Sequence, residues 1–197
     1  MTTLLTRRYE SALVYATQLH ATQKRKGTDI PYIDHLLSVS SLVLEAGGDE
    51  DEAIAGLLHD GPEDRGGQTT LDQIRELFGD RVADIVAACS DTFETEKPPW
   101  RQRKKAYLAD LETAAPSVLL VSCADKLHNA QSLLEDYRQL GEALWDRFNA
   151  TREETLWYYG ELTRIFQERG PQSLARRLVR TVDVLQAAVV GGAAGTA

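Results

Sequence analysis

The chain has 197 residues, of which 43% are hydrophobic and 26% charged, values that suit one globular domain with a buried core. The formal net charge of −8 argues against a nucleic-acid partner, which would need a broad excess of Lys and Arg. No apolar run approaches the roughly 20 residues of a membrane helix, and no apolar segment typical of a secretory signal follows Met1. We therefore expect a cytoplasmic protein without a membrane partner, in which Cys89 and Cys123 are reduced core thiols.

Helical periodicity runs through almost the whole sequence, and strand signals are scarce. The first helix is expected over residues 7–22, followed by a polar loop over 24–34 that contains Gly and Pro. The next two helices are expected over 35–45 and 49–59. Gly61-Pro62 should end the second of these, because proline supplies no backbone donor and restricts the residue before it.

The second half of the sequence is also predicted to be helical. Thr70 is expected to cap a short helix that reaches Phe78, with Gln73 as its helper. Later helices are expected over residues 80–90, 100–112, 116–135, 141–167 and 173–188. The small residues of 191–197 predict a flexible tail behind a domain over 1–190. The predicted fold class is all-α, a single-domain helical bundle.

His59 and Asp60 follow an apolar run, residues 53–58, at the point where the predicted helix ends. Imidazole and carboxylate are both suitable ligands for a divalent metal such as Mn²⁺. An acidic residue at a helix C-terminus opposes the helix dipole unless a cation lies nearby. This favours a metal site over the alternative, a histidine with ordinary hydrogen bonds beside a C-terminal carboxylate.

Asp125 lies in a segment that is apolar on most of its faces, since residues 118–121 and Ala124 precede it. A carboxylate in such a core must be paired or must coordinate a metal. Lys126 should point about 100° away around the helix, whereas Asn129 shares the face of Asp125. A buried salt bridge between Asp125 and an arginine is the alternative to a metal.

His35 opens another predicted helix and completes a set of two histidines and two aspartates with His59, Asp60 and Asp125. Helical bundles build metal sites in this way, from side chains on facing helices. Such a set leaves positions open on Mn²⁺ for water and a phosphate oxygen. That arrangement is typical of a catalytic site rather than a structural one.

Glu63 and Asp64 follow the Gly61-Pro62 break and are expected on the next turn, near the metal. Hydrolysis of a phosphate ester needs a deprotonated and oriented water, which a carboxylate can provide. A solvated acidic loop is the alternative for this pair. Basic residues gather at 24–26 and 101–105, as expected of an acidic protein that binds an acidic small molecule.

Three strings occur in order along the chain. They are Arg25-Lys26-Gly27 with Pro31-Tyr32-Ile33-Asp34-His35, then His59-Asp60 with Glu63-Asp64, then Ala124-Asp125-Lys126-Leu127-His128-Asn129. This ordered set resembles the hydrolase domain of RelA/SpoT-type alarmone enzymes, within the HD metal-dependent phosphohydrolases. The resemblance covers about residues 7–170. In its length, the chain resembles a small alarmone hydrolase. The resemblance implies an all-helical HD-type bundle.

The resemblance also implies an activity and a site. The activity is removal of pyrophosphate from the 3′ position of ppGpp or pppGpp, which leaves GDP or GTP, with Mn²⁺ as cofactor. The implied metal ligands are His35, His59, Asp60 and Asp125. The implied catalytic residues are Glu63 and Asp64, and the implied substrate-binding residues are Arg25, Lys26, Lys104 and Asn129.

Two positions depart from the family pattern. Leu36 stands where the family usually has proline, which changes the helix start and no ligand. The loop from Arg25 to His35 is about one residue longer than in the large bifunctional enzymes, and the resemblance implies that this loop touches the base. Adenine nucleotides such as ppApp therefore stay open as substrates, as do deoxynucleotides or NADPH for another HD phosphohydrolase. A nucleotide-binding regulator without catalysis is the alternative from a different class.

Overall fold

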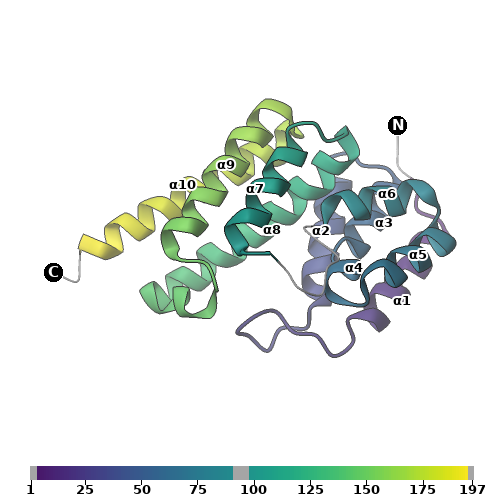
Figure 1. The fold of residues 1–197 in the computed structure, drawn as a ribbon, viewed down its shortest axis with the longest axis horizontal. Coiled ribbons are helices and arrows are strands. Elements are labelled where there is room, and N and C mark those ends of the chain that lie inside the picture. Colours follow the sequence, from purple (N-terminus) through teal and green to yellow (C-terminus); the bar gives the residue numbers. More distant parts are fainter. Residues whose placement is uncertain (1–3, 91–97, 195–197) are drawn as a thin grey trace.

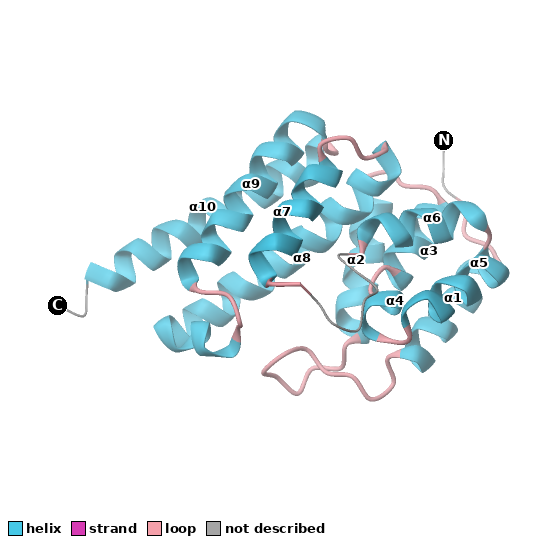
Figure 2. Ribbon diagram, viewed as in Figure 1, coloured by secondary structure: helices cyan, strands magenta, loops and turns pink. Residues whose placement is uncertain are grey.

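The computed structural model describes residues 4–90 and 98–194, and every regular element in these ranges is a helix (Figure 2). The strand-like feature there is an isolated antiparallel bridge between Lys24 and Pro31, within the loop after the first helix. The predicted all-α fold is confirmed. The elements are α1 (Arg7–Leu19), α2 (Ile33–Glu45), α3 (Glu50–Leu58), α4 (Gly61–Asp64), α5 (Gly67–Phe78), α6 (Asp80–Cys89), α7 (Trp100–Leu111), α8 (Pro116–Leu140), the 3₁₀ helix η1 (Gly141–Arg147), α9 (Arg152–Arg169) and α10 (Gln172–Ala194).

Helix α8 is the central helix of the fold. It contacts α2, α3 and α6, and it also contacts α9, α10 and η1. Figure 1 shows α1–α6 gathered around one end of α8, with α7, α9 and α10 towards the other. Because α8 is buried along most of its length, with Val121, Cys123, Ala124 and Leu127 fully inaccessible, it can carry a polar side chain into the centre of the molecule.

Helices α2 and α3 pack closely because Gly56 of α3 has no side chain. A Cβ atom at Gly56 would lie 3.1 Å from Ser40 Cα and 3.3 Å from Ser40 N. The Ser40 hydroxyl donates to the carbonyl of Ala53 at 2.9 Å and lies 2.8 Å from the hydroxyl of Tyr9 on α1. Three helices are thereby joined into one unit that supports the start of α2 and the end of α3.

Helix α3 begins and ends close to the predicted residues. Asp49 caps it, and Glu52 completes a capping box through two hydrogen bonds of 2.8 and 3.0 Å. The helix ends at Leu58, and Pro62 lies in the first turn of α4. The predicted break at Gly61-Pro62 therefore separates two helices, and it places Glu63 and Asp64 on the second.

The predicted cap at Thr70 is wrong. Helix α5 begins at Gly67, behind Gly66, whose φ of +105° is a left-handed conformation that glycine adopts without a steric penalty. Thr70 lies inside the helix, and its hydroxyl donates to the carbonyl of Arg65. The Thr70 hydroxyl therefore donates to the turn before the helix and does not accept from a backbone N–H group at the start of a helix, as a cap would.

The single helix predicted over 141–167 is also wrong. Helix α8 continues to Leu140, past the predicted end at Glu135, and Gly141 with φ of +58° terminates it. The 3₁₀ helix η1 follows, and α9 begins only at Arg152. Thr151 and Glu154 form a second capping box, a start signal that lay within the segment predicted to be continuous.

Helix α10 continues to Ala194, so the first four residues of the tail predicted for 191–197 are helical, and 195–197 lie outside the described residues. The end of α10 projects from the body of the molecule in Figure 1. Within the described ranges, no helix has both the length and the apolar character needed to cross a bilayer.

Candidate active site

His35 and His59 approach each other from neighbouring helices. His35 lies in the first turn of α2 and is fully buried, and its Nε2 is 3.3 Å from Asp125 Oδ1 and 3.5 Å from Asp60 Oδ2. His59 is the C-cap residue that follows Leu58, the last residue of α3. Its Nε2 is 3.1 Å from Asp60 Oδ2 and 3.7 Å from Asp125 Oδ1. Two imidazoles and two carboxylates therefore face one another, as expected from the sequence.

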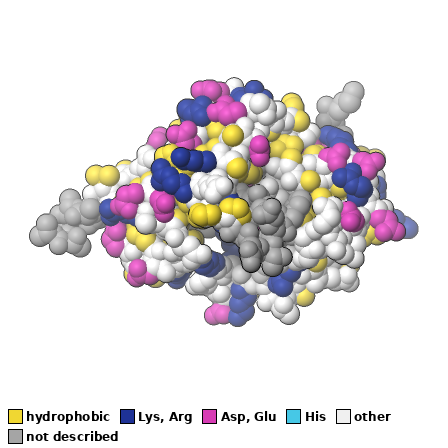
Figure 3. All heavy atoms as spheres, in the orientation of Figure 1, with side chains coloured by type: hydrophobic (Ala, Val, Ile, Leu, Met, Phe, Trp, Pro, Cys, Tyr) yellow, Lys and Arg dark blue, Asp and Glu magenta, His cyan; other side chains and the backbone are white. Residues whose placement is uncertain are grey.

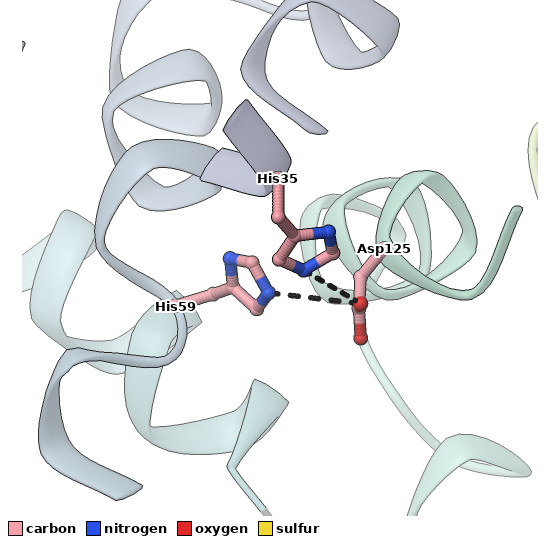
Figure 4. Close-up of side chains that lie close together, drawn as sticks. All are labelled: His35, His59 and Asp125. Atoms are coloured by element: carbon pink, nitrogen blue, oxygen red, sulfur yellow. Dashed lines mark ion pairs between the residues drawn. The ribbon is translucent and has the colours of Figure 1, made fainter. Parts of the chain in front are cut away.

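The ligand set fits a divalent transition metal. The Nε2 atoms of His35 and His59 are buried and have no hydrogen-bond partner, although carboxylate oxygens surround them. His59 Nδ1 donates to the carbonyl of Gly56 at 2.9 Å, which in the neutral ring leaves a lone pair on Nε2. Candidate ligand atoms of His35, His59 and Asp125 all lie within 4.8 Å of one another (Figure 4). The two carboxylates favour a positive charge at this point, which either a proton on Nε2 or a metal ion can supply.

The charges at this site depend on one another. Burial alone lowers the pKa of His59, but the Asp60 and Asp125 carboxylates outweigh it and raise this pKa well above its usual value. Burial raises the pKa of Asp125, but Lys126 and the two imidazoles outweigh that effect and hold it well below its usual range. Asp60 likewise stays ionised, with its pKa lowered mainly by His59 against the effect of burial. Both carboxylates are thus negatively charged at neutral pH.

Asp125 has partners on its own helix. Asn129 Nδ2 donates to Asp125 Oδ1, as expected for residues that share a face. Lys126 Nζ donates to Asp125 Oδ2 at 2.6 Å, so the prediction that Lys126 points away is wrong. Its long, flexible stem allows the ammonium group to fold back over the ring of Tyr107, 4.9 Å from the ring centroid. The cation beside this carboxylate is a lysine rather than the arginine considered as an alternative.

Two further residues that contact the predicted metal ligands were not expected from the sequence. Tyr32 donates its hydroxyl to Asp60 Oδ2 at 2.6 Å. His128 Nδ1 lies 2.8 Å from Nδ1 of His35. Both residues stand within the strings quoted above, so their positions were visible, but nothing in the sequence indicates which side chain each one contacts.

Glu63 and Asp64 lie on α4, the turn that follows His59 and Asp60. Gln23 Nε2 donates to Asp64 Oδ2 at 2.6 Å, and Arg65 Nε donates to Gln23 Oε1 at 3.0 Å, which fixes the orientation of the amide. Partial desolvation and the negative charge of Asp60 raise the pKa of the Asp64 carboxyl group, although this residue is exposed at the surface. The structure therefore places this pair on the helical turn that Asp60 precedes.

A cavity of about 850 Å³ lies next to the ligand cluster, between the 24–32 loop and α7, α8 and α9. Its basic lining residues include Arg25, Lys26, Lys104 and Lys126, and its aromatic ones include Tyr158. The cavity reaches the ligands through Tyr32, Lys126 and Asn129, which contact Asp60 and Asp125. The four predicted substrate-binding residues, Arg25, Lys26, Lys104 and Asn129, all line it.

The contacts of these residues hold them at the cavity wall. Arg25 Nη2 donates to Asn129 Oδ1 at 2.9 Å, and its guanidinium lies 5.9 Å from the ring centroid of Tyr32. Lys26 Nζ lies 5.6 Å from the ring of Phe148, and Lys104 Nζ 5.2 Å from that of Tyr158. The aromatic residues of α9 and of the loop before it were not predicted as site residues, because the sequence there was interpreted as one continuous helix.

The positive charge in the cavity is local. Acidic and basic side chains are interspersed over the face of the molecule drawn in Figure 3, with hydrophobic atoms between them. The chain as a whole carries a formal charge of −8. A small anionic ligand suits this distribution better than a nucleic-acid duplex does.

Comparisons with known proteins identify several relatives. The chain is 37% identical over 128 residues to a guanosine-3′,5′-bis(diphosphate) 3′-pyrophosphohydrolase of Aquifex aeolicus, a match that covers 63% of this chain and 17% of that protein. The chain thus spans about a sixth of the length of that relative. It is 34% identical over 122 residues to the pyrophosphohydrolase MESH1 of Xenopus tropicalis, which covers 60% of this chain and 65% of MESH1.

Solved structures share the fold. A crystal structure of a Listeria monocytogenes EGD-e protein has a TM-score of 0.67 at 28% identity and covers 80% of this chain and 99% of that one. A metazoan ortholog of SpoT has a TM-score of 0.75 at 22% identity, covers 95% and 99% of the two chains, and shows the fold alone. The model of the HD domain family matches residues 12–156, which is more than half of the chain. With this match and the clustered His and Asp residues, the chain belongs to the HD domain family.

Proposed function

We propose that this chain is a metal-dependent hydrolase that removes pyrophosphate from the 3′ position of guanosine alarmones, converting ppGpp to GDP and pppGpp to GTP. The observation that carries the proposal is the pair of buried, unpartnered Nε2 atoms of His35 and His59, which face two carboxylates beside a basic cavity. The names of the Aquifex aeolicus and Xenopus tropicalis relatives support this choice of reaction. We assign the activity to a domain over residues 1–190. We place the protein in the cytoplasm because Cys89 and Cys123 are free and buried.

In this proposal, His35, His59, Asp60 and Asp125 hold one Mn²⁺. Two imidazole nitrogens and two carboxylate oxygens form a mixed donor set that suits Mn²⁺ better than Mg²⁺, which prefers oxygen ligands alone. When bound, the ion would neutralise charge on the phosphate oxygens and lower the pKa of a water molecule. Lys126 and Tyr32 would keep the two carboxylates oriented, through their hydrogen bonds to Asp125 and Asp60.

The proposed chemistry assigns proton transfer to Glu63 and Asp64. One of them accepts a proton from the attacking water while the water oxygen bonds to the phosphorus on O3′. The P–O3′ bond breaks, pyrophosphate leaves, and O3′ takes up a proton to become the ribose hydroxyl. The pKa of the Asp64 carboxyl group is raised, so it lies closer to neutral pH than the pKa of an ordinary aspartate. This favours proton exchange near physiological pH.

Substrate binding is proposed for the cavity. Lys104 lines it close to Lys126, so both ammonium groups could offset the negative charge of the pyrophosphate. Arg25 and Lys26 lie on the loop that lines the same cavity, where a guanidinium can stack on a purine. Asn129, which contacts both Arg25 and Asp125, would lie between the two ends and meet the ribose.

Turnover by purified protein tests this function. Protein treated with EDTA is reloaded with Mn²⁺, Mg²⁺ or Zn²⁺ and incubated with ppGpp, and the products are separated by anion exchange. We expect GDP and pyrophosphate in equal amounts, most rapidly with Mn²⁺. Faster cleavage of ppApp or NADPH than of ppGpp would contradict the guanosine assignment, and no cleavage of any of them would contradict a hydrolase.

Variants of the ligands test the metal site. Each proposed ligand supplies about one of the four protein atoms that coordinate the metal. His59→Ala and Asp125→Ala should therefore each abolish both Mn²⁺ retention and turnover. Asp183→Ala, at an exposed position of α10, is the matched control and should leave both unchanged. Bound metal is measured by elemental analysis after dialysis, and full retention in both ligand variants would contradict the assigned ligand set.

A further inference from the structure

His128 lies on α8, one helical turn after Asp125, and the proposed function gives it no role. Its Nδ1 is 2.8 Å from Nδ1 of His35, and the two rings have centroids 4.9 Å apart with a tilt of 42°. The distance is that of a hydrogen bond, so one of the two nitrogens carries a proton and the other accepts it. Which of them donates determines what His35 can do at its opposite edge.

The chemistry of neutral imidazole links the two edges of each ring. A neutral ring carries one proton, so a bare Nε2 on His35 requires the proton to be on Nδ1. His35 Nδ1 then donates to His128, whose own proton must be on its Nε2. In the opposite arrangement His128 donates, and His35 carries its proton on Nε2, where it would block a metal.

The surroundings of the two rings favour the first arrangement. His35 Nε2 faces Asp125 Oδ1 at 3.3 Å and Asp60 Oδ2 at 3.5 Å, and a metal held among these atoms requires this nitrogen to be bare. A second cavity, of about 370 Å³, is lined by His128 together with Ser38, Ser41 and Gln131. Because His128 is half-buried and borders this cavity, a proton on its Nε2 need not be left unsolvated.

His59 provides an internal comparison. Its Nδ1 donates to the carbonyl of Gly56 at 2.9 Å, and its Nε2 likewise faces the carboxylates without a hydrogen bond. A backbone carbonyl is always an acceptor, so the tautomer of His59 is determined by the fold of α3. His35 has no such carbonyl at its Nδ1, and the atom in the equivalent position belongs to His128.

We propose that His128 is a positioning residue that accepts the Nδ1 proton of His35 and thereby presents a bare, correctly oriented His35 Nε2 to the metal. The inference rests on the metal site of the proposed function. It does not depend on which nucleotide is cleaved. Acceptors of this kind behind a ligating histidine fix its tautomer and orientation in metalloproteins generally.

Two substitutions of His128 distinguish a role in accepting the His35 proton from a role in packing. His128→Asn places an amide oxygen near the position of Nδ1, and this oxygen can accept from His35. His128→Leu keeps a similar volume and offers no acceptor. Titration of metal-free protein with Mn²⁺ should show an affinity about 10- to 100-fold weaker for His128→Leu. The affinity of His128→Asn should stay close to that of the wild type.

Nitrogen NMR detects the tautomer of each histidine ring directly. It uses the wild-type protein, so it does not depend on whether a variant folds. The chain has four histidines, so the spectrum of protein with ¹⁵N-labelled histidine, loaded with diamagnetic Zn²⁺, contains few signals. We expect two rings, those of His35 and His59, coordinated through Nε2 with a proton on Nδ1, and a neutral His128 with its proton on Nε2. A His128 that carries its proton on Nδ1 would overturn the inference.

The titrations distinguish the possible failures. Equal Mn²⁺ affinity for wild type and His128→Leu overturns the inference alone, as does equal weakening by Leu and Asn, which would indicate a packing role. A wild-type protein that binds no Mn²⁺ overturns both the inference and the proposed function. The expected pattern of affinities in a protein that does not cleave ppGpp supports the inference and contradicts the proposed function.

Discussion

The two carboxylates that follow His59 and Asp60 lie on the same short helix, α4. Asp64 accepts a hydrogen bond from Gln23, whose amide is oriented by Arg65. Glu63 is half-buried on the same short helix. An oriented carboxylate with a raised pKa is suited to accept a proton, and its neighbour can hold the water that loses it. Both are therefore expected to act at the chemical step rather than in metal binding.

Amide substitutions test this separation. Glu63→Gln and Asp64→Asn keep the size of each side chain and remove its capacity to take a proton. Each should lower kcat by roughly 100-fold or more, the usual scale of general acid–base catalysis, while bound Mn²⁺ and thermal stability stay unchanged. Steady-state kinetics and elemental analysis give both quantities. A kcat near that of wild type in either variant would mark that residue as a loop carboxylate without a catalytic role.

Arg25 lies on the loop that lines the cavity, and it contacts Asn129 and the ring of Tyr32. Asn129 accepts from Arg25 and donates to Asp125, so the loop and a proposed ligand share a partner. Removal of the guanidinium leaves the amide of Asn129 in contact with Asp125. The loss should therefore fall on substrate binding and not on the metal.

The corresponding prediction concerns KM. Arg25→Ala should raise KM for ppGpp, with a loss of about 1–2 kcal/mol, or roughly 5- to 30-fold in kcat/KM, and with unchanged metal content. Arg25→Lys, which keeps the charge but loses the planar group, should fall between Ala and wild type. Kinetics on ppGpp and ppApp measure both effects. An unchanged KM and base preference in Arg25→Ala would show that the loop does not contact the substrate.

At the scale of elements, the distance between α2 and α3 determines whether His35 and His59 meet. Gly56 allows the close contact, and its carbonyl also accepts from His59 Nδ1. A methyl group there would be pressed against the backbone of Ser40, which cannot move aside as a flexible side chain can. One glycine thus controls both the packing of two helices and the geometry of the ligand pair.

Gly56→Ala should therefore destabilise the metal-free protein by about 1–3 kcal/mol, the usual cost of overpacking, and should weaken Mn²⁺ binding. Gly160→Ala is the matched control, because a Cβ atom at Gly160 in α9 would meet nothing within 4 Å. That substitution should instead stabilise the protein by about 0.5–1 kcal/mol, through helix propensity. Urea denaturation measures both changes. Equal stabilities for the two variants would contradict the role given to the α2–α3 contact.

At the scale of the whole molecule, the proposed ligands join distant parts of the chain. His35 and His59 belong to the group of helices α1–α6, whereas Asp125 lies on α8, which also supports α9 and α10. A metal held between them binds the folded chain and not the unfolded one. Metal binding should thus contribute directly to the stability of the fold.

Thermal melting with and without Mn²⁺ measures this linkage. Free Mn²⁺ at 100 times its Kd should stabilise the protein by about 2.7 kcal/mol, and for a domain of this size that raises Tm by about 5–10 °C. Asp125→Ala should melt at the same temperature with and without the ion. An identical Tm for wild type under both conditions would contradict a metal site between the helices.

Local patterns in the sequence were sufficient for much of this description. Helix periodicity, the carboxylates at the start of α3 and the break at Pro62 each depend on residues within a few positions of one another, and the structure confirms all three. The convergence of His35, His59, Asp60 and Asp125 was also expected, since side chains of this chemistry at helix ends or in an apolar core need a common partner.

Only the tertiary structure decided which side chains meet across helices. Tyr32 reaches Asp60, and His128 lies against His35. These contacts depend on how α2, α4 and α8 pack, and a rotation of one helix by a single residue would change every one of them. The aromatic wall of the cavity depends in the same way on η1 and α9, where two helical segments replace the one expected. Side-chain partners far apart in the chain are set by packing geometry, which a one-dimensional pattern does not contain.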